Sequence, residues 1–202
     1  MANNNLKRYN NLSYLYSPFR EEVIQLILSI RQNQLPFIVY ETYRTPQRQK
    51  YLNHSGYSTN EDPFLNAHVN GLAIDFMLNE KAVKSPSDDS MTIEQIVEKT
   101  LDERKSPKSL VIYDIGTNLL PANGKEARTI VENQNVLDFW QNLGKLIKNQ
   151  FPSLSWNGDK NKKENQLIGI DPPHVEFKKA TSLIRSGIAR QEIKRMGAPG
   201  LK

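Results

Sequence analysis

Two short segments of this sequence combine residue types that bind metal ions with residue types that move protons. The first is residues 66–75 (NAHVNGLAID), and the second is residues 171–174 (DPPH). The chain contains no cysteine, so disulfides, thiol nucleophiles and thiolate zinc sites are excluded. A metal ion would therefore have to be bound by histidine and carboxylate side chains.

The first segment places His68 and Asp75 seven residues apart. On a continuous strand this odd spacing would point the two side chains to opposite faces. Gly71 lies between them and allows the chain to turn, which would put His68 on a loop and Asp75 on a strand over residues 72–76. A carboxylate in so apolar a strand needs a binding partner, because an unpaired buried carboxylate is very costly. A metal ion would supply that partner.

The second segment separates Asp171 from His174 by two prolines. Each proline favours an extended conformation in the residue before it, and polyproline II has three residues per turn. The two side chains are therefore expected to project from the same side, as a metal ligand and a neighbouring base would. Glu176 would share a strand face with His174 and either orients that ligand or has an ordinary surface role. The remaining histidine, His54, is interpreted as a helix-end or loop residue.

The elements that must position these residues follow from hydrophobic periodicity and from capping and turn residues. Helices are expected from Ser17 to before Pro36, from Thr45 to about Asn53, and over residues 92–101, 136–151 and 181–196. Strands are expected over residues 37–44, 72–76, 110–115, 154–156 and 175–177. On the first strand, the side chains expected to share one face are Ile38, Tyr40, Thr42 and Arg44. This mixed order predicts an α+β fold.

Composition limits the classes of function. The 202 residues fit one domain, residues 1–202. The net charge of +5 is spread along the chain, and no clustered basic motif indicates a nucleic-acid partner. No stretch approaches the roughly 20 apolar residues of a membrane span, and the N-terminus lacks the pattern of a secretory signal. We therefore expect a chain made in the cytoplasm, without membrane insertion. If its substrate lies outside the cell, something else must deliver the chain to it.

Taken together, these segments resemble the zinc peptidase family that contains D-alanyl-D-alanine carboxypeptidases, the vancomycin-resistance D-alanyl-D-alanine dipeptidases and the phage L-alanyl-D-glutamate endolysins. The family signature SxHxxGxAxD is matched at every stated position but the first, where Asn66 stands. Its second signature, an acid, two residues and the third zinc ligand, is matched by residues 171–174. Residues 43–49 (YRTPQRQ) are similar to the family's strand-end arginine context, and residues 156–159 (WNGD) are similar to the Trp-Gly-Gly-Asp stretch of the endolysin branch.

The resemblance implies a small antiparallel sheet flanked by helices, with one zinc ion per chain at the sheet. It implies that His68, Asp75 and His174 bind the zinc and that Asp171 is the catalytic base. It also implies that Arg44 stabilises the oxyanion or holds a substrate carboxylate. Further candidates for substrate contact or for support of the ligands are Asn66, Trp156, Asp159 and Glu176.

The function expected from the resemblance is that of a peptidoglycan hydrolase, most simply an endolysin-like L-alanyl-D-glutamate endopeptidase acting on stem peptides. A holin or a larger assembly would deliver such an enzyme to the cell wall. The alternatives are a D-alanyl-D-alanine carboxypeptidase or dipeptidase, and a non-catalytic domain that zinc stabilises. Residues 78–153 are longer than a minimal endolysin needs, so they are expected to form a family-variable insertion that affects substrate choice.

Overall fold

The computed structural model describes residues 7–56, 58–78, 134–160 and 171–201. The helix predicted over residues 92–101 and the strand predicted over residues 110–115 lie outside the described residues. Among the described residues, no helix has the length and apolarity needed to cross a membrane.

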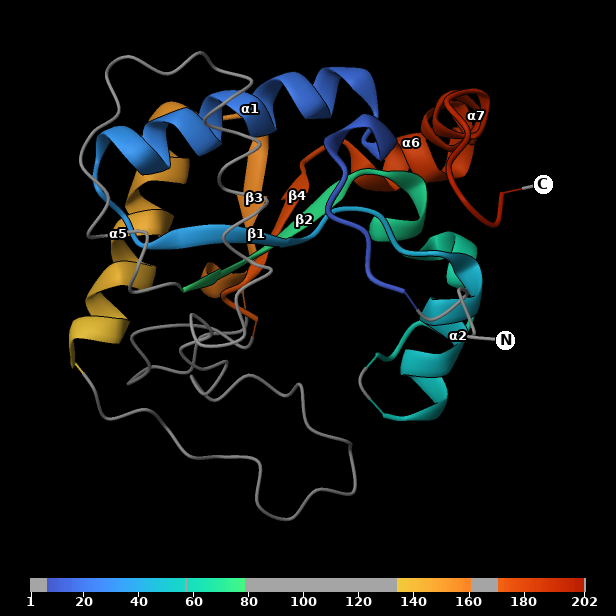
Figure 1. The fold of residues 1–202 in the computed structure, drawn as a ribbon, viewed down its shortest axis with the longest axis horizontal. Coiled ribbons are helices and arrows are strands. Elements are labelled where there is room, and N and C mark those ends of the chain that lie inside the picture. The colour runs from blue at the N-terminus through green and yellow to red at the C-terminus, as the bar shows by residue number, and fades with distance from the viewer. Residues whose placement is uncertain (1–6, 57, 79–133, 161–170, 202) are drawn as a thin grey trace.

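The described chain is a mixture of helices and short strands (Figure 1). In chain order the helices and strands are α1 (Ser17–Gln32), β1 (Phe37–Glu41), α2 (Pro46–His54), β2 (Ala73–Leu78), α5 (Gln134–Gln150), β3 (Leu154–Trp156), β4 (His174–Phe177), α6 (Ala180–Ser186) and α7 (Ile188–Arg195). Short 3₁₀ turns are η2 (Leu12–Tyr14), η3 (Pro63–Leu65), η4 (His68–Asn70) and η6 (Asn157–Asp159). The α+β class predicted from the sequence is confirmed.

The four strands form one antiparallel sheet with the order β1-β2-β4-β3. Its register places three polar residues in one row across the sheet. Glu41 on β1 pairs with Asp75 on β2, and Asp75 pairs on its other side with His174 on β4. The small antiparallel sheet flanked by helices is therefore present, and strand pairing brings Asp75 and His174 together although 99 residues separate them in sequence.

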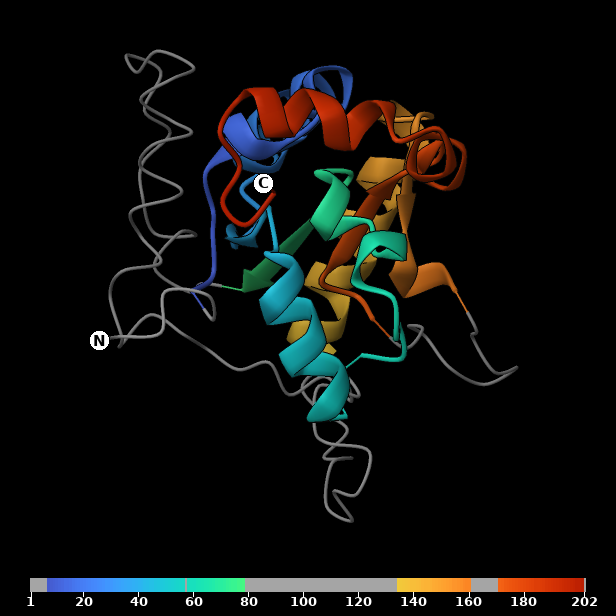
Figure 2. The ribbon, with the colours of Figure 1, turned by 90° about the vertical axis from the view of Figure 1, so that its right-hand side faces the viewer.

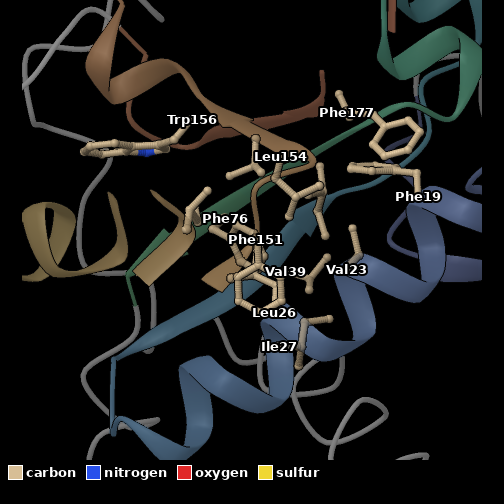
Figure 3. Packing of buried hydrophobic residues seen from close by; sticks show 14 of the residues in the cluster. Phe19, Val23, Leu26, Ile27, Val39, Phe76, Phe151, Leu154, Trp156 and Phe177 are labelled. Atoms are coloured by element: carbon tan, nitrogen blue, oxygen red, sulfur yellow. The ribbon is translucent and has the colours of Figure 1, made fainter. Parts of the chain in front are cut away.

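The hydrophobic core lies between the sheet and the two longest helices, α1 and α5 (Figure 3). Val23 and Ile27 on α1 lie at helical spacing and are fully buried. From α5, Trp140 packs its ring on Phe37 of β1 with centroids 4.6 Å apart. Trp140, Leu143, Ile147 and Phe151, which lie within the expected insertion, thus belong to the core of the domain.

The C-terminal helix predicted over residues 181–196 is instead two helices, and the single-helix prediction is wrong. Gly187 adopts a left-handed conformation with φ 70°, which ends α6 and begins α7. The bend lets α7 reach the start of α1, where Glu192 Oε1 accepts a hydrogen bond from Ser17 N at 2.9 Å. Figure 2 shows α6 and α7 running across the top of the view beside α1, with α2 below them and nearer the viewer.

Candidate metal centre

His68 is positioned by a tight turn that depends on two neighbours. The side-chain oxygen of Asn66 accepts a hydrogen bond from His68 N at 2.9 Å, so Asn66 supports the turn. Gly71 closes η4 with φ 65°, and a Cβ there would lie 2.6 Å from the carbonyl oxygen of Tyr14. Only glycine meets both conditions, so the turn that the sequence predicted at Gly71 is confirmed.

The Asp171–His174 segment is a turn, and its predicted polyproline II conformation is wrong. His174 N donates to Asp171 O at 3.2 Å, which closes a four-residue turn around the two prolines. His174 is both the last residue of the turn and the first residue of β4, so pairing of β4 with β2 fixes the position of His174. Strand pairing, which local sequence preferences cannot specify, decides this conformation.

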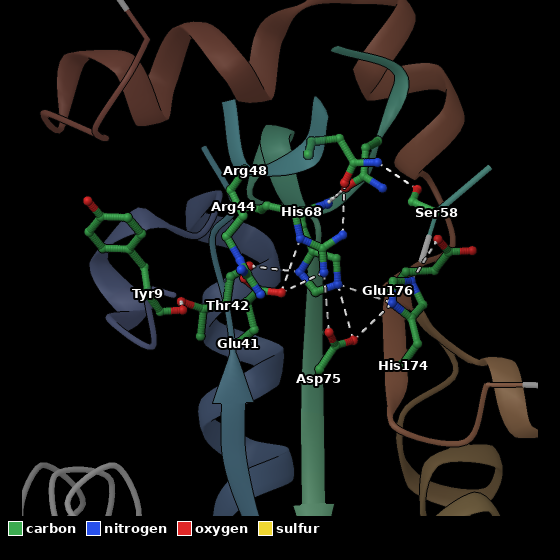
Figure 4. A network of polar contacts seen from close by, with 12 residues as sticks. Tyr9, Glu41, Thr42, Arg44, Arg48, Ser58, His68, Asp75, His174 and Glu176 are labelled. Atoms are coloured by element: carbon green, nitrogen blue, oxygen red, sulfur yellow. Dashed lines mark hydrogen bonds and ion pairs between the residues drawn. The ribbon is translucent and has the colours of Figure 1, made fainter. Parts of the chain in front are cut away.

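Three side-chain atoms from His68, Asp75 and His174 converge on one point (Figure 4). His68 Nε2 lies 3.1 Å from Asp75 Oδ1 and 3.2 Å from His174 Nδ1. The third edge of the triangle, from His174 Nδ1 to Asp75 Oδ1, is also 3.1 Å. The structure therefore brings together the three residues that the motifs single out, although η4, β2 and β4 are separate elements.

The outer contacts of the two imidazoles determine which ring nitrogens face this point. His68 Nδ1 donates to the carbonyl oxygen of Thr42 at 3.2 Å, which leaves Nε2 as an acceptor in the neutral ring. His174 Nε2 donates to Glu176 Oε2 at 3.4 Å, which leaves Nδ1 as an acceptor when the ring is neutral. Three electron-pair acceptors about 3 Å apart repel one another unless a cation lies among them. The residues therefore fit a metal ion.

The types of ligand atom at the site favour some metal ions over others. Two imidazole nitrogens and one carboxylate oxygen suit zinc, which such ligands bind at about 2.0–2.2 Å. The side chains of His68, Asp75 and His174 are 2%, 13% and 12% exposed, so the site is enclosed on the His68 side and touches solvent beside the other two. Three protein ligands with one side open leave room for a further ligand.

The pKa values of Asp75 and His174 are shifted because these acceptor groups lie close together. Burial raises the pKa of Asp75, but the charges and hydrogen bonds of His68 and His174 outweigh it and hold that pKa well below its usual range. Burial lowers the pKa of His174, but hydrogen bonds to Asp75 and Glu176 raise it to about 10. In the metal-free protein, a proton on His174 thus takes the place of the cation.

A bound metal must displace that proton, so metal affinity should depend on pH. Because the pKa of His174 is raised to about 10, the ring is protonated at neutral pH and metal binding releases one proton. We expect zinc affinity, measured by competition with a chelator, to rise about tenfold per pH unit between about pH 7 and 9. His54→Ala serves as the control, since His54 lies exposed at the end of α2, with its ring on the Lys50 carbonyl. An affinity that does not change with pH would contradict this assignment.

Glu176 contacts the outer nitrogen of His174, as its interpretation as an orienting residue requires. Its Oε2 contacts His174 Nε2, and its Oε1 forms a 2.6 Å ion pair with Lys160. These two contacts outweigh the effect of burial and lower the pKa of Glu176 to about 2, so it stays a carboxylate. A carboxylate behind a metal-binding histidine fixes the ring and raises its basicity.

The side chain of Arg44 lies at the site, but the alternation of side chains along β1 is not what places it there. The pairing of β1 with β2 is irregular between Val39 and Glu41, which indicates a β-bulge at Tyr40. Beyond it, the hydroxyl of Thr42 turns to the carbonyls of Tyr9 and Asn11. The shared face holds for Ile38 and Tyr40, which pack in one cluster with Met77. It does not extend to Thr42 and Arg44, because the bulge shifts the alternation and β1 ends at Glu41.

The bulge turns Glu41 onto the site, and sequence reasoning missed this residue. Glu41 is 1% exposed, and its Oε2 accepts from Nε and Nη2 of Arg44 at 3.1 and 2.6 Å. Its Oε1 accepts from Arg48 Nε at 2.7 Å. Nη1 of Arg44 donates to Gln49 Oε1 at 2.9 Å, and Nη2 of Arg44 lies 3.6 Å from Asp75 Oδ2. The available signal was a lone carboxylate in an apolar strand, the same signal that identified Asp75.

Asp171 is mostly buried beside the three converging side chains. Burial raises its pKa, and Asp75 adds to this, while His174, His68 and a hydrogen bond from the Asn157 side chain act in the opposite direction; the net pKa is raised. A carboxylate accepts hydrogen bonds, so the amide of Asn157 is the donor. Asn157 occupies a position where the similar endolysin stretch has glycine, and its contact with Asp171 was not predicted.

Two further candidates, Trp156 and Asp159, are not among the residues whose side-chain atoms converge. Trp156 is 6% exposed, and its Nε1 donates to Pro172 O at 2.7 Å. Asp159 is exposed at the end of η6. Among the described residues, the group of metal-binding side chains consists of His68, Asp75 and His174.

Comparisons of the chain with protein-family models, with curated proteins and with solved structures find no significant match. A functional assignment therefore depends on the motif residues and on the site that they form here.

Proposed function

We propose that this protein is a zinc-dependent peptidase in which His68, Asp75 and His174 bind the zinc ion. The observation that carries this proposal is the triangle of three acceptor atoms with edges of 3.1–3.2 Å. Two histidines and one carboxylate with one open position are the ligand set of several catalytic zinc sites. We also propose that the four-stranded sheet and its helices have the fold of the D-alanyl-D-alanine peptidase family. The motifs of this chain resemble the motifs of that family.

The chain also holds a group that can move protons next to this site. A zinc ion, when bound, supplies a Lewis acid and lowers the pKa of a water molecule to about 7. Asp171 then accepts the proton of the attacking water and transfers it to the leaving amine. Because its pKa is raised by burial, Asp171 binds a proton more strongly than an exposed aspartate does. The Asn157 amide keeps this carboxylate oriented.

Arg44 supplies fixed positive charge at the site. Glu41 and Gln49 hold its guanidinium on two sides, and its Nη2 also lies near Asp75 Oδ2. We assign Arg44 to stabilising the negative charge that develops on the substrate carbonyl oxygen, with a second role in restraining Asp75. Its charge persists because its pKa is raised: burial lowers that pKa, but Glu41 and Asp75 outweigh the effect.

Arg44→Lys tests this role while keeping the charge. Lysine cannot reproduce the planar set of contacts with Glu41 and Gln49, so we expect kcat/KM to fall about 10²–10³-fold. Peptide hydrolysis is the measurement, and Arg185→Lys, an exposed change on α6, is the control. Kinetics equal to those of the unmodified protein would show that Arg44 has no part in the reaction.

For the substrate we propose the stem peptide of peptidoglycan, with cleavage between L-alanine and D-glutamate. The match of residues 66–75 and 171–174 to the murein peptidase signatures supports this class, and the stretch at 156–159 favours the endolysin branch. The net charge of +5 favours an anionic cell wall, and added salt should weaken that attraction.

The decisive experiment is digestion of purified peptidoglycan, followed by mass spectrometry of the fragments. Free D-alanyl-D-alanine and an ordinary L-peptide are offered in parallel. A new D-glutamate amino terminus supports the endopeptidase. Release of D-alanine assigns the protein to the carboxypeptidase or dipeptidase class with the same residues. Zinc binding without cleavage of any of the three substrates overturns the proposal in favour of a zinc-stabilised binding domain.

A further inference from the structure

The side chain of Trp156 is confined by two glycines that approach it closely. A Cβ at Gly144 on α5 would lie 2.1 Å from Cζ3 of the indole, and one at Gly158 in η6 would lie 2.0 Å from Cζ2. Neither glycine adopts a positive φ, so the space taken by the indole is what requires glycine at these positions. Figure 3 shows the Trp156 ring at one end of the core, apart from Phe19 and Phe177.

The indole N–H completes the hydrogen bonding of the Asp171–His174 turn. Three successive carbonyl oxygens of this turn each accept one hydrogen bond. Asp171 O accepts from His174 N, and Pro173 O accepts from Phe76 N at 2.9 Å. Both of these donors are backbone groups. The carbonyl between them, Pro172 O, accepts from the Trp156 side chain at 2.7 Å.

This contact matters because the turn contains both the third metal ligand and the base. The two prolines have no N–H, so the middle of the turn cannot donate to other parts of the chain. β3 brings Trp156 opposite Val175, directly after His174. The indole thus links the packing of α5 and η6 to the peptide unit between Asp171 and His174.

We propose that Trp156 is a positioning residue, whose indole N–H holds the Asp171–His174 turn so that His174 Nδ1 meets the other two ligands. The part of this inference that concerns Asp171 rests on the proposed function. The part that concerns the metal depends only on the site. Gly144 and Gly158 are required indirectly, because a side chain at either position would displace the indole.

The second tryptophan of the chain provides a matched comparison. Trp140 is 4% exposed and Trp156 is 6% exposed, and both belong to the same core cluster. The Nε1 of Trp140 is buried and has no hydrogen-bond acceptor within the described part of the chain. The two residues therefore share burial and size and differ in whether the N–H binds the turn.

The experiment compares Trp156→Phe with Trp140→Phe. Zinc affinity is measured by competition with a chelator, and kcat and KM are measured on any substrate that is cleaved. Loss of an outer contact that orients a ligand typically costs 10–100-fold, so we expect zinc affinity to fall by about this factor in Trp156→Phe. We also expect kcat to fall with little change in KM, while Trp140→Phe keeps the zinc affinity of the unmodified protein. Equal zinc affinities in the two variants would overturn the inference.

A measurement on the unmodified chain covers the case in which Trp156→Phe does not fold. The chain has two tryptophans, so its ¹H–¹⁵N spectrum contains two indole N–H signals, and Trp140→Phe assigns them. Zinc addition should shift the Trp156 signal more than the Trp140 signal, because the indole binds the turn that carries His174. A Trp156 signal that zinc does not move overturns the inference. These readouts do not need peptide cleavage, so failure of the proposed function and failure of this inference are distinguishable.

Discussion

Replacing Asp171 with asparagine is expected to reduce peptide hydrolysis about 10²–10⁴-fold while zinc remains bound. The amide has nearly the shape of the carboxylate and can still accept the hydrogen bond from Asn157, so the turn keeps its conformation. It cannot take a proton from the attacking water, and this is the step that the variant removes. Steady-state hydrolysis of the cleaved substrate and the zinc content of the same sample are the measurements.

The control for this variant is Glu21→Gln. Glu21 is an exposed carboxylate on α1, so its loss changes the net charge by the same amount without removing the base. Its hydrolysis rate should stay near that of the unmodified protein. If Asp171→Asn kept nearly the full activity of the unmodified protein, the base would have to be another group.

The second large effect is expected from removal of a metal ligand. The unmodified protein should contain about one zinc ion per chain, and His68→Ala should contain none after dialysis against a chelator. His68 supplies one corner of the triangle, and its loss leaves Asp75 and His174 with too few ligands. Zinc content by elemental analysis and the change in melting temperature on zinc addition are the measurements. A ligand at 1,000 times its Kd stabilises the folded state by about 4 kcal/mol, so the unmodified protein should melt at a higher temperature with zinc.

His54→Ala is the matched control, because the chain has three histidines and His54 alone lies away from the site. It should retain one zinc ion and the zinc-dependent rise in melting temperature. Zinc retained by His68→Ala and lost by His54→Ala would refute the ligand assignment and, with it, the proposed function.

The His68→Ala and Asp171→Asn variants together separate zinc binding from peptide hydrolysis. Loss of His68 should abolish both zinc binding and hydrolysis, whereas Asp171→Asn should abolish hydrolysis alone. A structural zinc site predicts the first result without the second, since it needs no base. The pair therefore distinguishes a zinc peptidase from a domain that zinc only stabilises.

Much of the site could be predicted from local sequence because local chemistry determines it. The absence of cysteine restricts the ligands to His, Asp and Glu. Gly71 marks the turn through a conformation that other residues adopt poorly. A charged residue in an apolar strand indicates a partner at Asp75. Thr45 followed by Pro46 marks the start of α2, where the Thr45 side chain accepts from Arg48 N. Each of these signals involves residues within a few positions of one another.

The convergence of the site was decided by tertiary structure. Pairing of β2 with β4 sets Asp75 opposite His174, and no local preference encodes a register between strands 99 residues apart. The same pairing holds residues 171–174 as a turn where the prolines alone favoured an extended chain. Glu41 faces the site because of a bulge, whose extra residue is defined only by comparison with the partner strand.

Local sequence also does not predict the role of Trp156 or the orientations of the two imidazole rings. A tryptophan in a short strand is typical of a core, and only the folded chain places its N–H against Pro172 O. The nitrogens that His68 and His174 present to the site depend on Thr42 O and Glu176, and Thr42 lies 26 residues from His68. The sequence by itself thus determined which residues can bind a metal and that the chain turns at Gly71. Contacts between distant segments decided how those side chains meet, because such contacts depend on strand register and packing, which no short stretch of sequence contains.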